Sequence, residues 1–322
     1  MKTLMNLTVF DHDMNRFRDK EDLRSFYQSY GIEGLELQLL WREPLPEKIP
    51  AEDIVGIHTR MFPYWLDLWS GNTEALLEEF GTKKNLGLYY EGEEVDCILR
   101  RLKGELNRAQ ELGAKYVVFH VSDCRLSEVY TGQFHYRDEA VIDASCEIIN
   151  ALLDGAEYSF TFLVENLWWP GFRMTDPKLT ERLMEGIHTE KKGIILDTGH
   201  LMHTNLDLRN EEEGIDYVER ILDQHGELCR YIKGLHLHQS ITGNYVKTVW
   251  KNPPKLKEDF WERLWQCMEH VAKIDQHMPF TTPIANRLIQ RIQPDYLNLE
   301  YISANREEHA KKLATFRPEP LR

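Results

Sequence analysis

Four short apolar runs in this sequence end in residues that bind metal ions or move protons. The runs at residues 162–165, 193–197, 234–238 and 296–300 end in Glu165, Asp197, His236 with His238, and Glu300. Carboxylates and imidazoles grouped in this way are typical ligands of a divalent cation, and a pair of carboxylates is able to take up and return a proton. Asp197 before a glycine-containing turn also fits a helix cap. The repetition of the pattern favours a shared site.

The chain around these residues alternates between strand and helix patterns. Strands are predicted over residues 4–10, 34–39, 54–58, 113–120, 158–165, 193–197, 232–238 and 296–300. Helices are predicted over residues 21–27, 95–112, 138–153, 179–187, 213–229, 260–274, 283–292 and 306–313. Eight short apolar strands separated by helices predict a parallel (β/α)8 TIM barrel. The carboxyl ends of its strands meet at one mouth, which would make the four strand-end residues neighbours.

Further candidates lie at other strand ends and in one loop. His58 and His120 end the third and fourth predicted strands, where each is either structural or part of the site. The broken segment after Glu165 would carry Trp168 and Arg173 toward a pocket, although Arg173 equally fits a pair with a surface acid. Glu36, inside the second strand, is either a buried partner for a cation or part of a polar barrel layer.

Length and composition predict one domain over residues 1–322, since the 322 residues are 42% hydrophobic and contain no Pro/Gly/Ser-rich linker. An extended, aromatic-rich connection follows the third strand at about residues 59–92. It predicts either the core of a helical insertion or a lid with flat faces for a sugar ring.

Charge and targeting features exclude several classes of protein. The formal charge of −14 disfavours a nucleic-acid partner, which would require clustered Lys and Arg. No apolar run is long enough to cross a membrane, and the N-terminus lacks a signal-peptide pattern, so we expect a cytoplasmic protein. The five cysteines form no CxxC motif and predict neither a disulfide framework nor a thiolate zinc site.

The ordered set of strand ends resembles the xylose-isomerase-like TIM barrel family, which includes sugar-phosphate isomerases and epimerases, ketose 3-epimerases and AP endonucleases. The segments that carry the resemblance are Val164-Glu165-Asn166, Leu196-Asp197-Thr198-Gly199-His200, His236-Leu237-His238 and Leu299-Glu300. The resemblance implies a divalent ion, Mn2+, Mg2+, Co2+ or Zn2+, held by Glu165, Asp197, His236 and Glu300. His236 and His238 share one face of a strand, so either could be the ligand, and we favour His236.

The resemblance also implies an activity and a substrate site. We expect a metal-dependent sugar or sugar-phosphate isomerase or epimerase that works through an enediolate, with Glu165 and Glu300 transferring the proton. The residues expected to contact the substrate are His200, His238, His58, His120, Trp168 and Arg173. The expected partner is a small sugar or sugar phosphate. We expect neither a nucleic acid nor a membrane as a partner, and the sequence leaves open whether the chain forms a homo-oligomer.

Two alternatives remain on the same barrel. His58 and His120 resemble the ligands of an additional metal in the AP-endonuclease branch, which hydrolyses phosphodiesters. That branch also carries a later Asp-x-His pair, and none is found between His238 and Pro253, which counts against this alternative. A dehydratase, a lyase or a binding protein that has lost catalysis is the other alternative.

Overall fold

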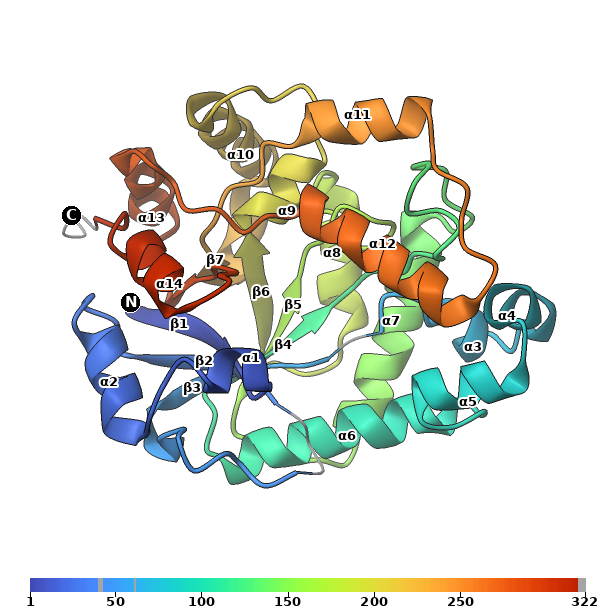
Figure 1. Cartoon of the computed structure of the whole chain (residues 1–322), viewed down its shortest axis with the longest axis horizontal. Helices are drawn as coiled ribbons and strands as arrows, with labels where there is room; N and C mark the ends of the chain where they lie inside the picture. The colour runs from blue at the N-terminus through green and yellow to red at the C-terminus, as the bar shows by residue number, and fades with distance from the viewer. Residues whose placement is uncertain (40–42, 61, 318–322) are drawn as a thin grey trace.

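A closed barrel of eight parallel strands forms the centre of the computed structural model, which describes residues 1–39, 43–60 and 62–317 (Figure 1). The strands pair in chain order, and β8 closes the barrel against β1. They are β1 Lys2–Thr8, β2 Gly34–Gln38, β3 Ile54–His58, β4 Tyr116–His120, β5 Thr161–Glu165, β6 Lys192–Asp197, β7 Ile232–His236 and β8 Tyr296–Leu299. The predicted (β/α)8 TIM barrel is therefore confirmed.

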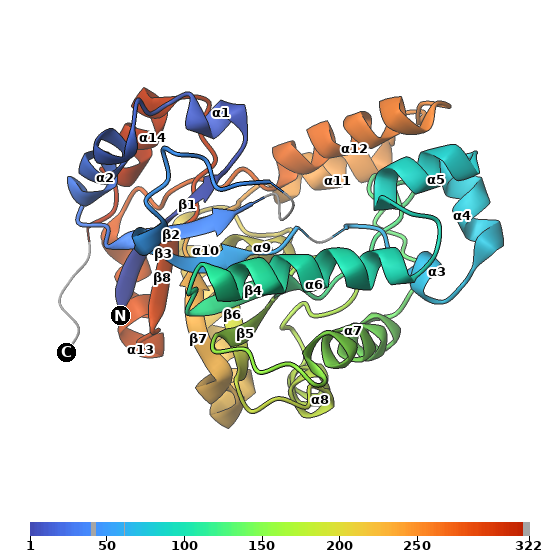
Figure 2. The ribbon, with the colours of Figure 1, turned by 90° about the horizontal axis from the view of Figure 1, so that it is seen from below.

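Helices surround the barrel and cover the outer faces of its strands (Figures 1 and 2). The α-helices in the first half are α1 Asp11–Met14, α2 Lys20–Gln28, α3 Leu66–Trp69, α4 Thr73–Phe80, α5 Lys83–Tyr90, α6 Asp96–Glu111 and α7 Asp138–Leu153. Those in the second half are α8 Pro177–Gly186, α9 Thr198–His203, α10 Glu211–His225, α11 Gly243–Lys251, α12 Phe260–Ile274, α13 Asn286–Ile292 and α14 Arg306–Leu313. Short 3-10 turns are η1 Ala51–Asp53, η2 Gly226–Tyr231 and η3 Pro283–Ala285.

Element ends differ from the predicted ends where side chains or turns interrupt the pattern. β1 ends at Thr8 rather than residue 10, because the Asp13 carboxylate accepts hydrogen bonds from both the Thr8 amide and its hydroxyl at 2.8 Å. β7 ends at His236, so His238 lies beyond the strand that was predicted to contain it. The helix predicted over 283–292 begins as the turn η3 before α13.

The barrel interior changes from apolar to polar toward the carboxyl ends of the strands. Leu163 and Ile195 are fully buried in an inner apolar cluster that also includes Leu4, Val55, Tyr116 and Val118. Two residues further along the same strands stand Glu165 and Asp197. Because side chains two positions apart share one face of a strand, the alternation that buries the apolar pair also turns these carboxylates inward.

Two helical insertions rise beside the mouth. The connection at residues 59–92 contains α3, α4 and α5, and Met61 within it lies outside the described residues. Tyr64, Trp65 and Tyr90 are fully buried in this insertion, as its core. The second insertion, α11 and α12, lies between β7 and β8, and Figure 2 places it over α5. In the described part of the chain, no helix has both the length and the apolar character needed to span a bilayer.

Candidate metal centre

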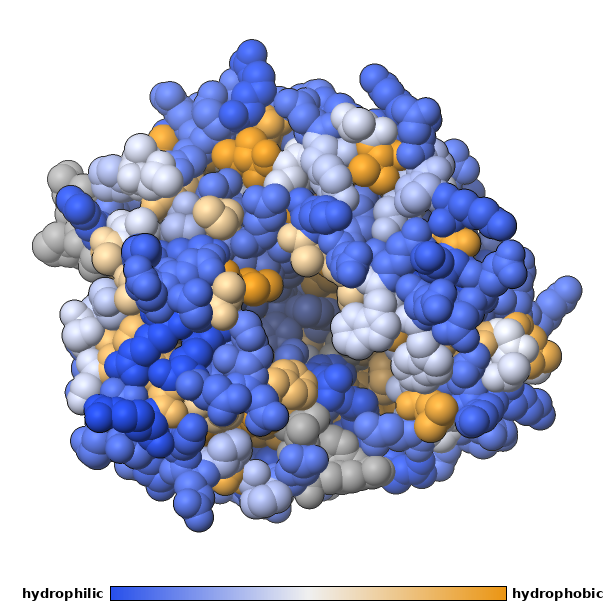
Figure 3. Space-filling view, in the orientation of Figure 1, coloured by the Kyte–Doolittle hydropathy of each residue, from blue (hydrophilic) through white to orange (hydrophobic). Residues whose placement is uncertain are grey.

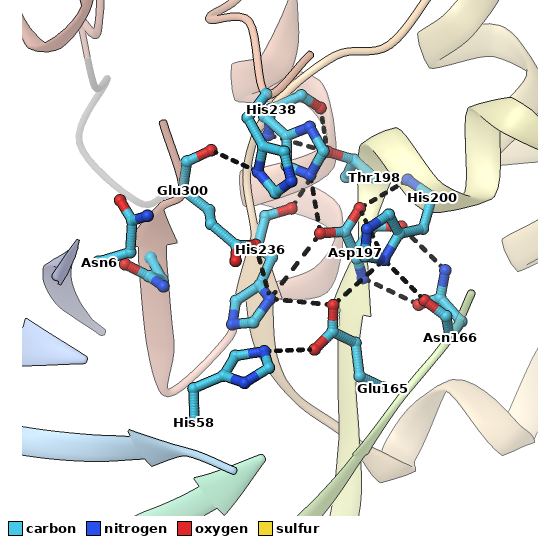
Figure 4. A network of polar contacts seen from close by, with 12 residues as sticks. Asn6, His58, Glu165, Asn166, Asp197, Thr198, His200, His236, His238 and Glu300 are labelled. Atoms are coloured by element: carbon cyan, nitrogen blue, oxygen red, sulfur yellow. Dashed lines mark hydrogen bonds and ion pairs between the residues drawn. The ribbon is translucent and has the colours of Figure 1, made fainter. Parts of the chain in front are cut away.

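The four strand-end residues meet at the mouth of the barrel (Figure 4). Glu165 ends β5, Asp197 ends β6, His236 ends β7 and Glu300 follows β8. One ligand atom from each lies within 4.8 Å of the others. His236 Nδ1 lies 3.3 Å from Glu165 Oε1 and 3.0 Å from Glu300 Oε2. The barrel thus brings together residues that are far apart in the chain.

Asp197 both caps a helix and faces the centre. Its Oδ1 accepts the backbone N–H of His200 at 2.6 Å, which caps α9, while His238 Nε2 lies 2.8 Å from its Oδ2. Gly199 makes this turn possible, because a Cβ atom at that position would lie 2.0 Å from Cε1 of the His238 ring. The Asp197 carboxylate therefore has two roles: Oδ1 caps α9, and Oδ2 faces the centre.

A second group of ligand atoms shares Glu165. His58 Nε2 lies 3.1 Å from Glu165 Oε2, and His120 Nε2 lies 3.0 Å from the same oxygen. These histidines end β3 and β4, next to β5 in the barrel. One carboxylate that faces two sets of nitrogen donors is suited to bridge two ions.

A third group contains His200, His238, Asp275 and His277. Asp275 Oδ2 lies 3.1 Å from His200 Nε2 and 2.7 Å from His277 Nε2. Asp275 and His277 form an Asp-x-His pair that follows α12, beyond the stretch in which the pair was expected. The stretch between His238 and Pro253 does lack the pair, but the pair is present further along the chain, so its absence from that stretch no longer counts against the phosphodiesterase alternative. The Asp-x-His motif at residues 275–277 was the sequence signal, and it follows the insertion of α11 and α12.

Contacts on the far side of several imidazoles fix which nitrogen faces the centre. Nδ1 of His58 lies 3.1 Å from the Thr59 carbonyl oxygen, Nδ1 of His200 lies 2.9 Å from that of Asn166, and Nδ1 of His277 lies 3.0 Å from that of Glu300. A carbonyl only accepts, so each Nδ1 donates its proton to that oxygen and each Nε2 is the nitrogen that faces the centre. His277 also has a φ of 46°, a left-handed conformation that is uncommon for a residue with a side chain.

Glu36 orients His236 in the same way, a role that the sequence alone leaves open. The carboxylate of Glu36 lies 3.0 Å from His236 Nε2 and accepts hydrogen bonds from the Tyr116 hydroxyl at 2.5 Å and the Asn298 amide at 3.0 Å. Since Nε2 donates to this carboxylate, Nδ1 of His236 is the nitrogen that faces Glu165 and Glu300. Glu36 is a buried acid that positions a candidate ligand.

Unpaired polar atoms indicate where a cation fits. Among the described residues, buried atoms without a hydrogen-bond partner include Glu165 Oε1, His236 Nδ1, Glu300 Oε2 and His120 Nε2. Buried polar atoms are seldom left unpaired, because desolvation without a partner costs about 1–3 kcal/mol each. Glu165 Oε1, His236 Nδ1 and Glu300 Oε2 lie close to one another, and a divalent ion among them would supply the missing partner. The mixed nitrogen and oxygen donors suit Zn2+, Mn2+, Co2+ or Mg2+.

The electrostatics of Asp275 keep it ready to bind a cation. Burial alone would raise the pKa of this carboxyl group, but the imidazoles of His277 and His200 hold its pKa well below the usual range. Burial alone would likewise lower the pKa of His277, and the Asp275 carboxylate instead raises it to about 9. The carboxylate is therefore charged at neutral pH, as metal ligation requires.

A cavity of about 360 Å³ lies above these groups, and Figure 3 shows its opening as a hollow near the middle of that face. Residues from the predicted site that line it are His58, His120, Trp168, His200 and Glu300. Asp275 and His277 line it too, whereas Glu165, Asp197, His236 and His238 are fully buried and do not. Arg173 is elsewhere: its guanidinium pairs with the Asp138 carboxylate, the surface alternative left open by the sequence.

Fold and site together define a TIM-barrel protein whose mouth carries several groups of metal-type ligands. The chain belongs to the xylose isomerase-like TIM barrel family, whose model matches residues 26–316. The resemblance drawn from the strand ends is thereby confirmed. A comparison with curated proteins finds no match.

Solved structures similar to this chain include several enzymes. Endonuclease IV from Thermus thermophilus shares 15% identity over 98% of this chain and 97% of that chain, with a TM-score of 0.47. A 3-keto-D-glucoside 4-epimerase from E. coli shares 12% sequence identity over 98% of this chain and 100% of the epimerase chain, with a TM-score of 0.47. A mannonate dehydratase from Streptococcus suis shares 12% sequence identity over 86% of this chain and 93% of the dehydratase chain, with a TM-score of 0.44. No function of this chain follows from likenesses at these identities and TM-scores.

Proposed function

We propose that the protein is a metal-dependent hydrolase of phosphate esters, with more than one divalent ion at the mouth of the barrel. The observation that carries this proposal is the presence of several adjoining ligand groups among the described residues, two of which share Glu165. His238 joins the third group to the first, because its Nε2 lies 2.8 Å from Asp197 Oδ2. Glu165, Asp197, His236 and Glu300 already supply four ligands, so the donors His58, His120, Asp275 and His277 are available to further ions.

Divalent ions about 3.5–4 Å apart favour in-line displacement at phosphorus, because they polarise the phosphoryl oxygens and stabilise both the entering and the leaving oxygen. The chain contributes fixed ligand geometry: His58, His200 and His277 are each held by a backbone carbonyl, so little reorganisation accompanies the reaction. None of the described residues that line the cavity is Lys or Arg. The negative charge of a phosphate would therefore be balanced by the ions themselves.

The second candidate is the sugar or sugar-phosphate isomerase or epimerase expected from the sequence. Glu165, Asp197, His236 and Glu300 form by themselves a ligand set for one ion, which supports this candidate. Its proton-transfer pair would be Glu165 and Glu300. Glu300 lines the cavity, but Glu165 is fully buried with four imidazoles around it, and a base has to reach the substrate carbon. This burial favours the hydrolase over the isomerase, and over a dehydratase or lyase that would use the same base.

One experiment separates the two candidates. The purified protein is loaded with Mn2+ or Zn2+, its metal content is measured, and it is assayed with bis(p-nitrophenyl) phosphate and with ketoses in deuterated water. We expect at least two ions per chain, ester hydrolysis that a chelator abolishes, and no exchange of carbon-bound hydrogen. A single ion per chain together with hydrogen exchange, and no hydrolysis, would replace the hydrolase by the isomerase.

A further inference from the structure

The insertion of α11 and α12 is held at one side of the mouth by contacts with other segments. At the start of α12, the rings of Phe260 and Phe80 lie 4.5 Å apart, and Trp261 Nε1 donates a hydrogen bond to Asn85 Oδ1 at 3.2 Å. Further along the helix, the Tyr130 hydroxyl donates to the carbonyl oxygen of Gln266 at 2.7 Å. These contacts join α12 to α4, to α5 and to the loop after β4, and Figure 1 shows α12 running toward α4.

The inner face of α12 forms part of the cavity wall. Leu264, Met268 and Val271 follow helical spacing and pack as partly buried apolar residues, and Met268 and Val271 line the cavity. Trp265, in the same helix, is 69% exposed and does not line the cavity. The residue that directly follows α12, at its C-cap, is Asp275, a member of the third ligand group. The same helix therefore walls the cavity and positions a candidate metal ligand.

Part of the cavity wall is apolar, in contrast to the charged ligand groups. Phe62, Trp168 and Ile302 line the cavity together with the two residues of α12, and its lining contains no Lys or Arg among the described residues. The Trp168 ring lies 5.2 Å from the ring of His200, so this aromatic face borders the third ligand group directly. A ligand that fills the cavity therefore meets both charged groups and carbon surface.

From this arrangement we infer the substrate class of the proposed hydrolase: a small phosphate ester that carries an apolar, ring-bearing substituent, with Met268 and Val271 as specificity-determining residues. The inference rests on the proposed function. A cavity of about 360 Å³ suits one compact molecule, and α12 walls one side of it. The charge of −14 also opposes binding of a polyanion.

The test measures binding without turnover. Phenylphosphonate and methylphosphonate, which are not hydrolysed, are titrated calorimetrically into the Mn2+-loaded protein, and an abasic DNA duplex is titrated in parallel. We expect phenylphosphonate to bind at least about tenfold more tightly than methylphosphonate, because the ring displaces water from the apolar wall. Duplex DNA should not bind at about 150 mM salt, a setting of roughly physiological ionic strength.

Variants assign the preference to the helix. Met268→Gln keeps the side-chain length but makes it polar, and Val271→Ala removes contact area; each should reduce the preference for the phenyl compound severalfold while leaving methylphosphonate binding unchanged. Trp265→Ala, on the exposed side of α12, is the matched control and should leave both affinities unchanged. Thermal unfolding of each variant verifies the fold.

The outcomes separate the inference from the proposed function. Equal affinities for the two phosphonates, an undiminished phenyl preference in both wall variants, or tighter binding of the duplex would overturn the inference. Phenyl-selective binding combined with the absence of ester hydrolysis would sink the proposed function and leave the binding site standing. Hydrolysis without phenyl selectivity would overturn the inferred substrate class and leave the proposed function standing.

Discussion

Asp67 and Glu165 are both fully buried carboxylates, but their polar neighbours differ. Asp67, in the first insertion, accepts two hydrogen bonds from the Arg125 guanidinium at 2.8 and 2.9 Å. It also accepts from the hydroxyls of Tyr64 and Tyr136 at 2.7 and 2.6 Å and from the Asn72 amide at 2.7 Å. Every donor belongs to the protein, so the network is complete without a ligand.

Glu165 is surrounded by imidazoles rather than by obligate donors. His58 and His120 approach its Oε2, while its Oε1 has no hydrogen-bond partner, although His200 and His236 lie 3.2 and 3.3 Å away. Imidazoles act as donors or as ligands, depending on what lies between them. Burial is the same at the two sites, and it is the pairing of the buried oxygens that distinguishes a structural carboxylate from a candidate ligand.

The largest effect is expected at Glu165. Glu165→Gln removes the charge that faces two ligand groups, so we expect the loss of at least one bound ion and a fall in phosphate-ester hydrolysis of about 100-fold or more. Elemental analysis and initial rates at saturating Mn2+ measure the two effects. A variant with full metal content and normal rates would remove Glu165 from the centre and end the contrast with Asp67.

Asp67 should affect stability without affecting metal. Asp67→Ala leaves the Arg125 charge and two tyrosine hydroxyls without their buried partner, and we expect the free energy of unfolding to fall by about 3–5 kcal/mol. Urea denaturation measures this change. The matched control is Asp143→Ala, which removes a solvent-exposed pair with Arg182 and should leave the free energy of unfolding nearly unchanged. A lower metal content in folded Asp67→Ala would show that the two carboxylates are not as distinct as their contacts imply.

Asp275 tests the third ligand group alone. Asp275→Asn should remove one ion per chain, keep the ion held by Glu165, Asp197, His236 and Glu300, and reduce hydrolysis about tenfold or more. Metal content measured beside that of Glu165→Gln reveals whether the groups act separately. If Asp275→Asn retains every ion and the full rate, the Asp-x-His pair is structural, and the isomerase gains support.

The smallest effect is expected at Arg173. Its guanidinium pairs with Asp138 away from the cavity and is partly exposed, so Arg173→Ala should leave KM and kcat unchanged and shift stability by about 1 kcal/mol or less. Steady-state kinetics and thermal unfolding test this. A large rise in KM would mean that this side chain turns toward the substrate, as the sequence also allowed.

Local pattern was sufficient to predict the barrel and its principal candidate ligands. Short apolar runs with alternation of period two encode strands, and parallel strands joined by helices have few ways to close. Residues at strand ends, such as Glu165, Asp197 and Glu300, then converge whatever the loops contain. For that reason the sequence alone predicted the strands and the meeting of these side chains.

Tertiary structure decided what the loops contribute. Asp275 and His277 join the centre only because α11 and α12 fold back over the mouth, and the packing of Phe260 on Phe80 that fixes this path is invisible in a local pattern. Arg173 likewise pairs with Asp138, a residue 35 positions away that no local pattern could identify as its partner. Strand ends are placed by the repeating geometry of the sheet, whereas loop residues are placed by contacts between segments far apart in the chain, and those exist only after folding.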